Sequence, residues 1–275
     1  MTDRYAVVGN PIAHSKSPEI HAAFARQTGQ DIDYSRLLAP PDAFRATVES
    51  FRAAGGKGVN VTLPFKLEAF DLADAVSRRA KDAEAANFLR FSEGRIHADN
   101  TDGIGLTRDI VHNLGFGLAG KRVLLLGAGG AAQGVLTPLL EHEPSILVIA
   151  NRTVEKALRL AETFRHKPVA AASVLSGLGF GELAGHHFDL VINATSTSLK
   201  GDLPPLPADA FAPGALAYDM MYGAAPTLFL AFAAAHGART ADGLGMLVEQ
   251  AAESFLLWRG VRPETAPVIA LLRKP

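Results

Sequence analysis

A lysine and an aspartate in the first half of the chain are of the types that carry acid–base chemistry. Lys66 follows the strand-like run Val59 to Thr62 and Pro64, a residue that can open a helix. We therefore expect Lys66 in a first helical turn, where the helix dipole disfavours a cation, and this indicates a role beyond helix stability. Asp102 precedes the apolar-periodic stretch Ile104 to Leu114. Such a pair can hold a substrate hydroxyl and move its proton while hydride leaves or arrives at the same carbon.

Both residues also have ordinary structural explanations. A long lysine side chain often only reaches solvent, and an aspartate before a helix commonly caps it. The functional interpretation requires that Lys66 and Asp102, each at the end of an element, face one crevice.

A glycine-rich turn lies in the middle of the chain, after the apolar run Val123 to Leu126. Gly127, Gly129 and Ala132 fit the fingerprint G-x-G-x-x-G/A, in which the glycines allow a tight turn and close approach of a dinucleotide's pyrophosphate. We expect Gly127, Ala128, Gly129, Gly130 and Ala131 to contact the cofactor at the N-terminus of the following helix. The alternative is an ordinary glycine-rich strand–helix turn.

The residues after the next apolar strand favour NADP over NAD. An NAD site usually has an acidic residue there for the ribose 2′-hydroxyl, whereas this chain has Asn151, Arg152 and Thr153. A guanidinium and two hydrogen-bonding side chains suit a 2′-phosphate. An exposed loop arginine is the alternative.

Two serines follow the first predicted strand. Ser17 before Pro18 is typical of a helix N-cap, whereas Ser15 lies outside that helix. Two hydroxyls beside a helix N-terminus, just past the end of a strand, can hold a small anion.

Strands and helices alternate along the whole chain. Leu67 to Ala85 carries apolar residues at helical spacing, and turn signals at Glu93-Gly94 predict a hairpin. The predicted strands are 5–8, 33–38, 59–62, 88–90, 95–98, 123–126, 146–150, 188–193 and 215–220, and the predicted helices are 19–27, 40–53, 104–114, 131–140, 227–236 and 246–258.

Composition limits the class of protein. The chain has 275 residues, enough for one large core or two smaller ones, and its net charge of −1 gives no reason to expect a nucleic acid or an anionic membrane as partner. It has no cysteine, which excludes disulfides and thiolate metal sites, and we expect no metal. No apolar run approaches a membrane span, and we expect a cytoplasmic protein.

Eight motifs carry a resemblance to a known family. They are Asn10 to Pro18, Asn60 to Lys66, Asn100 to Gly105, Gly127 to Ala132, Asn151 to Thr153, Asn193 to Ser196, Tyr218 to Tyr222 and Asp242 to Gln250. Each is weak alone, but in this order they resemble the shikimate dehydrogenases from end to end. The resemblance implies reversible NADPH-dependent reduction of 3-dehydroshikimate to shikimate, in aromatic amino-acid (chorismate) biosynthesis. We expect a monomer or homodimer.

The resemblance also implies roles for single residues. Lys66 and Asp102 form the catalytic pair, and Ser15, Ser17 and Tyr222 bind the substrate carboxylate. It assigns the binding of the ring hydroxyls to Thr62, Lys66, Asn87, Asp102 and Gln250, and contacts with the cofactor to Asn151, Arg152, Thr153, Met220 and Gly243. We also expect Thr195 to contact the cofactor, because it follows the strand 188–193 at the edge where open α/β sheets bind ligands. From spacing alone, Met220 is more often a core residue and Gln250 an exposed one. Phe88 departs from the threonine that commonly follows the substrate-binding asparagine of the family.

The predicted fold class is α/β with two domains and a cleft between them. Residues 1–101 and 240–275 form an N-terminal α/β substrate domain, to which the last helices return, and residues 102–239 form a Rossmann-like, doubly wound NADP-binding domain. Two alternatives stay open: a quinate or quinate/shikimate dehydrogenase of the same family, and a non-catalytic NADP-binding regulator.

Overall fold

Two compact units make up the chain. The computed structural model describes residues 2–195, 197 and 202–273, so Ser196, at the end of the motif that begins at Asn193, lies outside the described residues. The first unit is Met1–Gly105 with Leu247–Pro275, and the second is Leu106–Met246. The chain leaves the first unit within α5 (Asp102–Arg108) and returns to it within α9 (Leu244–Arg259).

A mixed six-stranded sheet forms the centre of the first unit. Its strands lie in the order β2-β1-β3-β5-β6-β4. β1 is parallel to β2 and β3, β5 is antiparallel to both β3 and β6, and β4 is parallel to β6. The strands are β1 (Asp3–Gly9), β2 (Ile32–Leu38), β3 (Gly56–Val61), β4 (Ala75–Val76), β5 (Phe88–Ser92) and β6 (Arg95–Asp99). Because β1, β3 and β6 run in the same direction, their carboxyl ends meet at one edge of the sheet.

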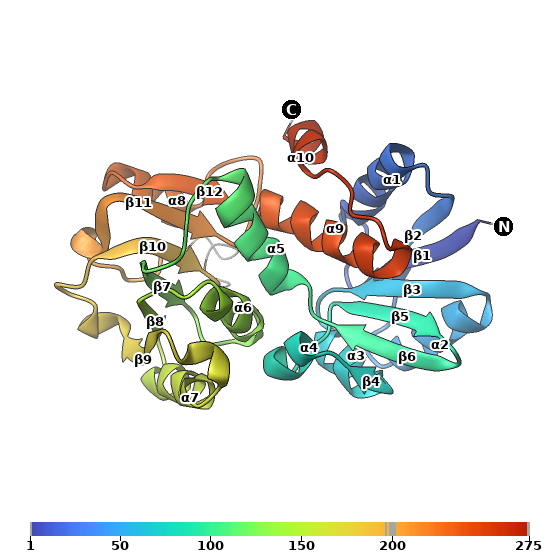
Figure 1. The fold of residues 1–275 in the computed structure, drawn as a ribbon, viewed down its shortest axis with the longest axis horizontal. Coiled ribbons are helices and arrows are strands. Elements are labelled where there is room, and N and C mark those ends of the chain that lie inside the picture. The colour runs from blue at the N-terminus through green and yellow to red at the C-terminus, as the bar shows by residue number, and fades with distance from the viewer. Residues whose placement is uncertain (1, 196, 198–201, 274–275) are drawn as a thin grey trace. The chain divides into compact units, whose positions relative to one another are not determined.

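Helices cover this sheet on both faces. Val8, Val59 and Val61 pack with Phe44 and Phe65 in a core under α2 and α3, whereas residues of α1, α9 and α10 form a separate core. Figure 1 shows α1, α9 and α10 on one side of the sheet and α2 and α3 on the other. The remaining helices of this unit are α1 (Ser17–Thr28), α2 (Phe44–Ala53), α3 (Lys66–Leu72), α4 (Arg78–Ala83) and α10 (Ala266–Leu272).

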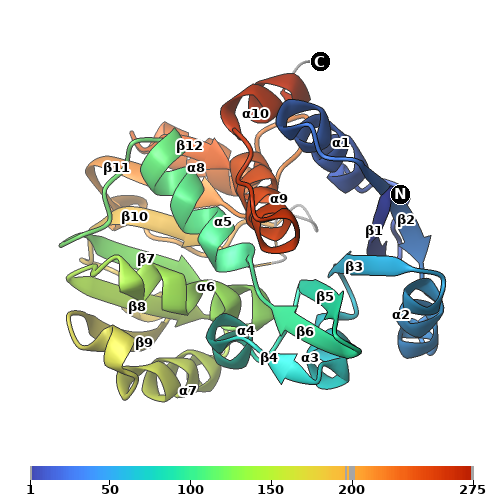
Figure 2. The same ribbon diagram turned by 45° about the vertical axis from the view of Figure 1, so that its right-hand side comes forward.

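The second unit is a doubly wound parallel sheet. All pairings are parallel, and the order β12-β11-β10-β7-β8-β9 reverses between β7 and β10, as in a Rossmann fold (Figure 2). The strands are β7 (Arg122–Leu126), β8 (Ile146–Asn151), β9 (Val174–Gly179), β10 (Phe188–Asn193), β11 (Phe211–Asp219) and β12 (Arg239–Asp242). This arrangement confirms the predicted α/β fold class with two domains, one of them Rossmann-like.

Successive side chains of each buried strand point to opposite faces of that sheet, so a hydrophobic core forms on each face. Val123 and Leu125 of β7 pack toward α6 (Gly130–Glu141) and α7 (Val154–Arg165), whereas Leu124 and Leu126 pack toward α8 (Leu228–Ala235). Short turns of other helix types are η1 (Asp109–Asn113), η2 (Pro168–Ala170), η3 (Phe180–Glu182) and η5 (Ala208–Ala210). Within the described ranges, no helix combines the length and the apolar character that crossing a membrane requires.

One predicted element is wrong in its extent. The stretch from Leu67 to Ala85 is not a single helix, because it forms α3, the short strand β4 and α4 in succession. Ser77 begins α4 anew, since its side chain accepts a hydrogen bond from the Ala80 backbone N–H. The apolar periodicity therefore continues from α3 to α4 although the helix is interrupted, and in the sequence only Ser77, an N-cap residue, indicates the interruption.

Candidate active site

One edge of the mixed sheet gathers the predicted catalytic segments. Ser15 and Ser17 follow β1, Thr62 and Lys66 follow β3, and Asp102 follows β6. Thr62 donates its backbone N–H to the Val8 carbonyl at 2.9 Å, which joins the ends of β1 and β3. The sheet topology thus brings together segments that lie far apart in the sequence.

Lys66 and Asp102 are in direct contact. Lys66 Nζ donates to Asp102 Oδ2 at 2.5 Å, and the two side chains are 30% and 19% exposed. Lys66 is the first residue of α3, and Asp102 is the first residue of α5. An ammonium held by a carboxylate, with both groups open to solvent, can exchange a proton with a bound hydroxyl or carbonyl oxygen.

Asn87 fixes the other oxygen of the aspartate. Its Nδ2 donates to Asp102 Oδ1 at 2.8 Å, while its Oδ1 accepts the Thr101 backbone N–H at 2.8 Å. A backbone N–H can only donate, so the Asn87 amide has one possible orientation, with Nδ2 facing Asp102. Gln250 lies 3.4 Å from both Asn87 Nδ2 and Thr101 Oγ1, so four of the predicted hydroxyl-binding residues form one cluster.

The two serines lie together, but Ser17 is not a helix cap. The N-cap position of α1 is Lys16, without a side-chain hydrogen bond, and Ser17 is the first helical residue. Ser15 Oγ donates to Ser17 Oγ at 3.2 Å and accepts the Ser17 N–H at 3.3 Å. The Arg36 guanidinium donates to the Ser15 carbonyl at 2.6 Å and adds positive charge beside the hydroxyls.

The glycine turn of the second unit has the shape that a pyrophosphate needs. Gly127 has φ +108°, a value that favours glycine, and an added Cβ there would lie 3.2 Å from the Ala194 carbonyl and from Thr195 Cγ2. Gly129 and Gly130 have no neighbour within 4 Å of an added Cβ, and α6 begins at Gly130 without a side-chain cap. Open space in front of exposed helical N–H groups fits a dinucleotide phosphate.

The other predicted cofactor residues lie at the carboxyl ends of neighbouring strands. Arg152 is exposed directly after β8, where Asn151 Nδ2 donates to the Thr153 carbonyl at 2.9 Å. Gly243, after β12, packs against Met220, after β11, so closely that an added Cβ would lie 2.2 Å from the Met220 carbonyl oxygen.

The resemblance groups Tyr222 with the two serines. It belongs to the second unit, whereas Ser15 and Ser17 belong to the first, and it is 37% exposed. Burial of part of the ring raises the pKa of the Tyr222 hydroxyl, which therefore stays protonated as a hydrogen-bond donor at neutral pH.

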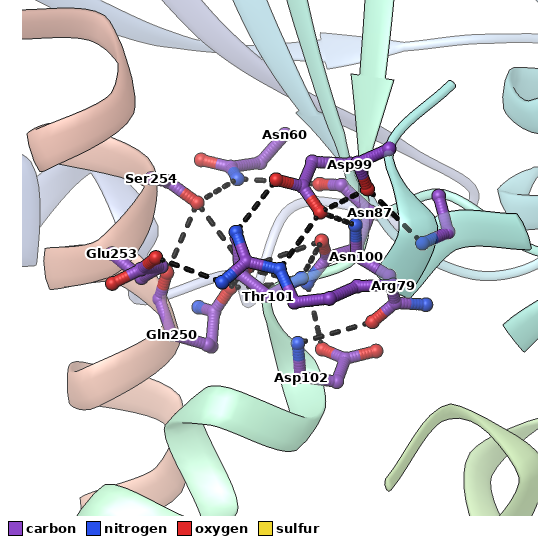
Figure 3. Close-up of polar contacts among 12 residues, drawn as sticks. Asn60, Arg79, Asn87, Asp99, Asn100, Thr101, Asp102, Gln250, Glu253 and Ser254 are labelled. Atoms are coloured by element: carbon purple, nitrogen blue, oxygen red, sulfur yellow. Dashed lines mark hydrogen bonds and ion pairs between the residues drawn. The ribbon is translucent and has the colours of Figure 1, made fainter. Parts of the chain in front are cut away.

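Several polar residues of the first unit were not predicted. Asn60 Nδ2 donates to Ser254 Oγ at 2.9 Å and to the Asn87 carbonyl at 3.2 Å, and Ser254 lies 3.4 Å from Thr101 Oγ1. Figure 3 shows these side chains beside Asp102 and Gln250. Asn60 and Thr101 stand inside the recognised motifs, but Ser254 lies one helical turn after Gln250, and only the fold shows that it faces them.

Phe88 has a structural role. Its ring stacks on Trp258 of α9 at a centroid distance of 4.9 Å, and Trp258 Nε1 donates to the Leu89 carbonyl at 3.2 Å. The side chain after Asn87 therefore helps to fix α9 on β5.

Comparisons with known proteins agree along the whole chain. The family descriptions that match are the shikimate dehydrogenase substrate binding domain (residues 7–89), shikimate/quinate 5-dehydrogenase (109–200) and the shikimate 5′-dehydrogenase C-terminal domain (243–273). The chain is 61% identical over 274 residues to the shikimate dehydrogenase (NADP(+)) of Nitrosospira multiformis, covering 99% of this chain and 98% of that protein.

Solved structures share the fold along nearly the whole chain. An Ael1 enzyme from Pseudomonas putida is 54% identical with a TM-score of 0.94, covering 100% of this chain and 99% of that one. Shikimate 5-dehydrogenase from Thermus thermophilus, in complex with NADP(H) and shikimate, is 34% identical with a TM-score of 0.87, and 99% of each chain is covered.

Proposed function

Because this chain belongs to the shikimate dehydrogenase family, we propose that it catalyses the reversible NADPH-dependent reduction of 3-dehydroshikimate to shikimate. It is an NADP-dependent oxidoreductase of the shikimate pathway. The observation that carries the residue-level proposal is the contact of 2.5 Å between Lys66 Nζ and Asp102 Oδ2.

Lys66 is proposed as the proton donor during reduction. Its ammonium uses one N–H in the bond to Asp102 and can direct another to the carbonyl oxygen of the substrate, where negative charge develops. Asp102 orients that ammonium, and Asn87 in turn orients Asp102. In the direction of oxidation, the Lys66 amine would accept the hydroxyl proton and return to the ammonium form, and the hydride would pass from the same carbon to NADP⁺.

The ring hydroxyls and the carboxylate of the substrate are assigned to separate groups. We propose that Thr62, Asn87 and Gln250 bind the hydroxyls together with the catalytic pair, because amide and hydroxyl groups can both donate and accept. Ser15 and Ser17 are proposed to bind the carboxylate, with Tyr222 as a further donor. Support comes from the contact between the two serine hydroxyls and the adjacent Arg36.

NADP is assigned to the carboxyl edge of the parallel sheet. We propose that the turn from Gly127 to Ala131 holds the diphosphate, and that Asn151, Arg152 and Thr153 hold the 2′-phosphate. Thr195, Met220 and Gly243, which follow the neighbouring strands, are proposed to contact the rest of the cofactor. When bound, NADPH supplies the hydride that the protein's own side chains cannot.

Quinate is the competing substrate, because the description that matches residues 109–200 includes quinate. The decisive experiment follows absorbance of the reduced nicotinamide with purified protein and four combinations: shikimate or quinate with NADP⁺ or NAD⁺. We expect turnover with shikimate and NADP⁺, and kcat/KM at least about tenfold lower in the other three combinations. NAD⁺ lacks the 2′-phosphate that Arg152 is proposed to bind, and quinate brings an additional hydroxyl on a saturated ring to which no partner is assigned. Faster turnover of quinate would contradict the substrate assignment, and no turnover at all would support a non-catalytic NADP-binding regulator.

The assembly and the location of the protein are also proposals. We expect a monomer or homodimer in the cytoplasm, which light scattering of the purified protein and fractionation of cells would test.

A further inference from the structure

A buried ionic network lies beside the proposed hydroxyl-binding cluster. Arg79 of α4 makes a bidentate contact with Asp99, with Nη2 to Oδ2 at 2.6 Å and Nε to Oδ1 at 3.0 Å, and its Nη1 donates to Glu253 Oε1 at 3.1 Å. The three side chains are 24%, 12% and 10% exposed. Figure 3 shows the guanidinium between the two carboxylates. Glu253 also pairs with Arg262.

Asp99 is connected to the segment that carries the catalytic aspartate. Its Oδ1 accepts the Asn100 backbone N–H at 2.7 Å and the Ser77 hydroxyl at 2.6 Å. Asn100 Oδ1 in turn accepts the Asp102 backbone N–H at 3.1 Å. The orientation of the turn before α5 therefore depends on Asp99.

Glu253 is connected to the helix that carries Gln250. The two residues are three positions apart on α9, so they lie on the same side of the helix. Ser254, on the same turn, accepts a hydrogen bond from Asn60 Nδ2 of β3 at 2.9 Å, which connects this turn of α9 to β3. Through its two carboxylate partners, Arg79 thus links the Asp102 segment to the Gln250 helix.

Stability alone does not explain such a network. Burying charges costs desolvation free energy, and apolar residues of similar size often stabilise a protein as well or better. Burial opposes the charge of Arg79, but the hydrogen bonds and the charges of Asp99 and Glu253 outweigh it, so that the pKa of Arg79 is raised. A guanidinium that is always charged and has a rigid fork of donors fixes two carboxylates in one geometry.

We propose that Arg79 is a positioning residue for the substrate, which holds the Asp102 segment and the Gln250 turn of α9 at the spacing that the ring hydroxyls require. This inference rests on the proposed function and extends it to a residue that does not contact the substrate. Loss of the link should impair binding and turnover of shikimate and leave the use of NADP⁺ unchanged.

The test uses the full-length enzyme with Arg79→Met, which removes the charge and keeps an unbranched side chain. We expect kcat/KM for shikimate to fall roughly 10- to 100-fold, the scale of a misplacement of about 1 Å. The Kd of shikimate from calorimetry should rise, and KM for NADP⁺ should stay within about twofold, since no cofactor group is moved. Arg79→Lys should be intermediate, because an ammonium cannot make the bidentate contact.

A double variant separates positioning from charge balance. In Arg79→Met/Asp99→Asn the unpaired charge at position 99 is gone, so Tm should recover while kcat/KM for shikimate stays low. Arg122→Met is the matched control, because Arg122 also makes a bidentate pair with Asp189, at 2.9 and 3.2 Å, but in the second unit at the start of β7. It should lower Tm and leave the kinetic constants unchanged.

Three outcomes would overturn the proposal. One is a folded Arg79→Met enzyme with kcat/KM within about twofold of the wild type, and another is full recovery of kcat/KM in the double variant. If Arg79→Met does not fold, the double variant and Arg79→Lys test the proposal instead. The third outcome is then wild-type kinetics in both of these variants. A wild-type enzyme that neither binds nor oxidises shikimate would instead refute the proposed function.

Discussion

The proposed substrate site and the proposed cofactor site differ in the part of the chain that forms them: side chains in the first, and backbone without side chains in the second. In the first unit, side chains hold one another, as in the chain of contacts from Lys66 through Asp102 to Asn87. In the second unit, the turn proposed to hold the diphosphate lacks side chains, and Gly129 and Gly130 leave open space before α6. The substrate site should therefore be sensitive to side-chain chemistry, and the cofactor site to any atom added to its backbone.

Removal of the proposed proton donor gives the largest expected effect. Lys66→Ala should lower kcat by about 10³-fold, within the range that positioned acid–base groups contribute, with a modest change in the Kd of shikimate. Steady-state kinetics and calorimetry measure the two quantities. Lys57→Ala is the control, because Lys57 is exposed on β3 in the same unit and should not change turnover. An unchanged rate in Lys66→Ala would remove Lys66 from the mechanism.

Adding one methyl group to the glycine turn gives the next largest effect. Gly129 has φ −100° and ψ −173°, which alanine also adopts, and the new Cβ would meet nothing within 4 Å. Gly129→Ala should therefore keep its Tm, while KM for NADP⁺ rises roughly tenfold because the methyl group occupies the space of the diphosphate.

The matched control is Gly117→Ala in the same unit, an exposed position where an added Cβ also meets nothing within 4 Å. It should change neither Tm nor KM. Wild-type KM for NADP⁺ in Gly129→Ala would place the diphosphate elsewhere and would weaken the contrast between the two sites.

The glycine turn proposed for the cofactor could be predicted from the sequence more fully than the ionic network of Arg79, Asp99 and Glu253. A glycine turn is local, and its meaning follows from a strand and a helix within about 30 residues. The contact between Arg79 and Glu253 spans 174 positions, so it depends on the complete topology of the first unit. Nothing in the spacing of those residues indicates that they meet.

Two strands of the parallel sheet also escaped prediction, for physical reasons. β9 contains Gly177, and an added Cβ there would lie 2.5 Å from the backbone of Ala157, so a glycine that lets α7 pack closely interrupts the apolar pattern. β12 has only four residues, Arg239–Asp242, and one of them is buried. Short edge strands of this kind gain their structure from the neighbouring strand rather than from their own sequence.

The smallest expected effect concerns pH and the first unit alone. His21 of α1 is fully buried and stacks on Tyr34 at a centroid distance of 4.1 Å. Burial lowers the pKa of His21 from 6.5 to about 3, and Asn60 opposes this shift in part. Because the folded-state pKa is depressed, the unfolded chain binds one more proton below pH 6.5, and the free energy of unfolding falls as the pH is lowered from 6.5 toward 3.

This histidine should remove about 1.6 kcal/mol from the free energy of unfolding between about pH 6.5 and 5, because the slope rises from about half of 1.4 kcal/mol per pH unit at pH 6.5 to nearly the full value at pH 5. Trp258 is the single tryptophan of the chain and lies 5.6 Å from the His21 ring, so its fluorescence in urea titrations reports on the first unit. His21→Phe should reduce the pH dependence by that amount, whereas the exposed His14→Gln should not. Equal pH dependence in wild type and His21→Phe would show that His21 is not the neutral buried group whose protonation accompanies unfolding.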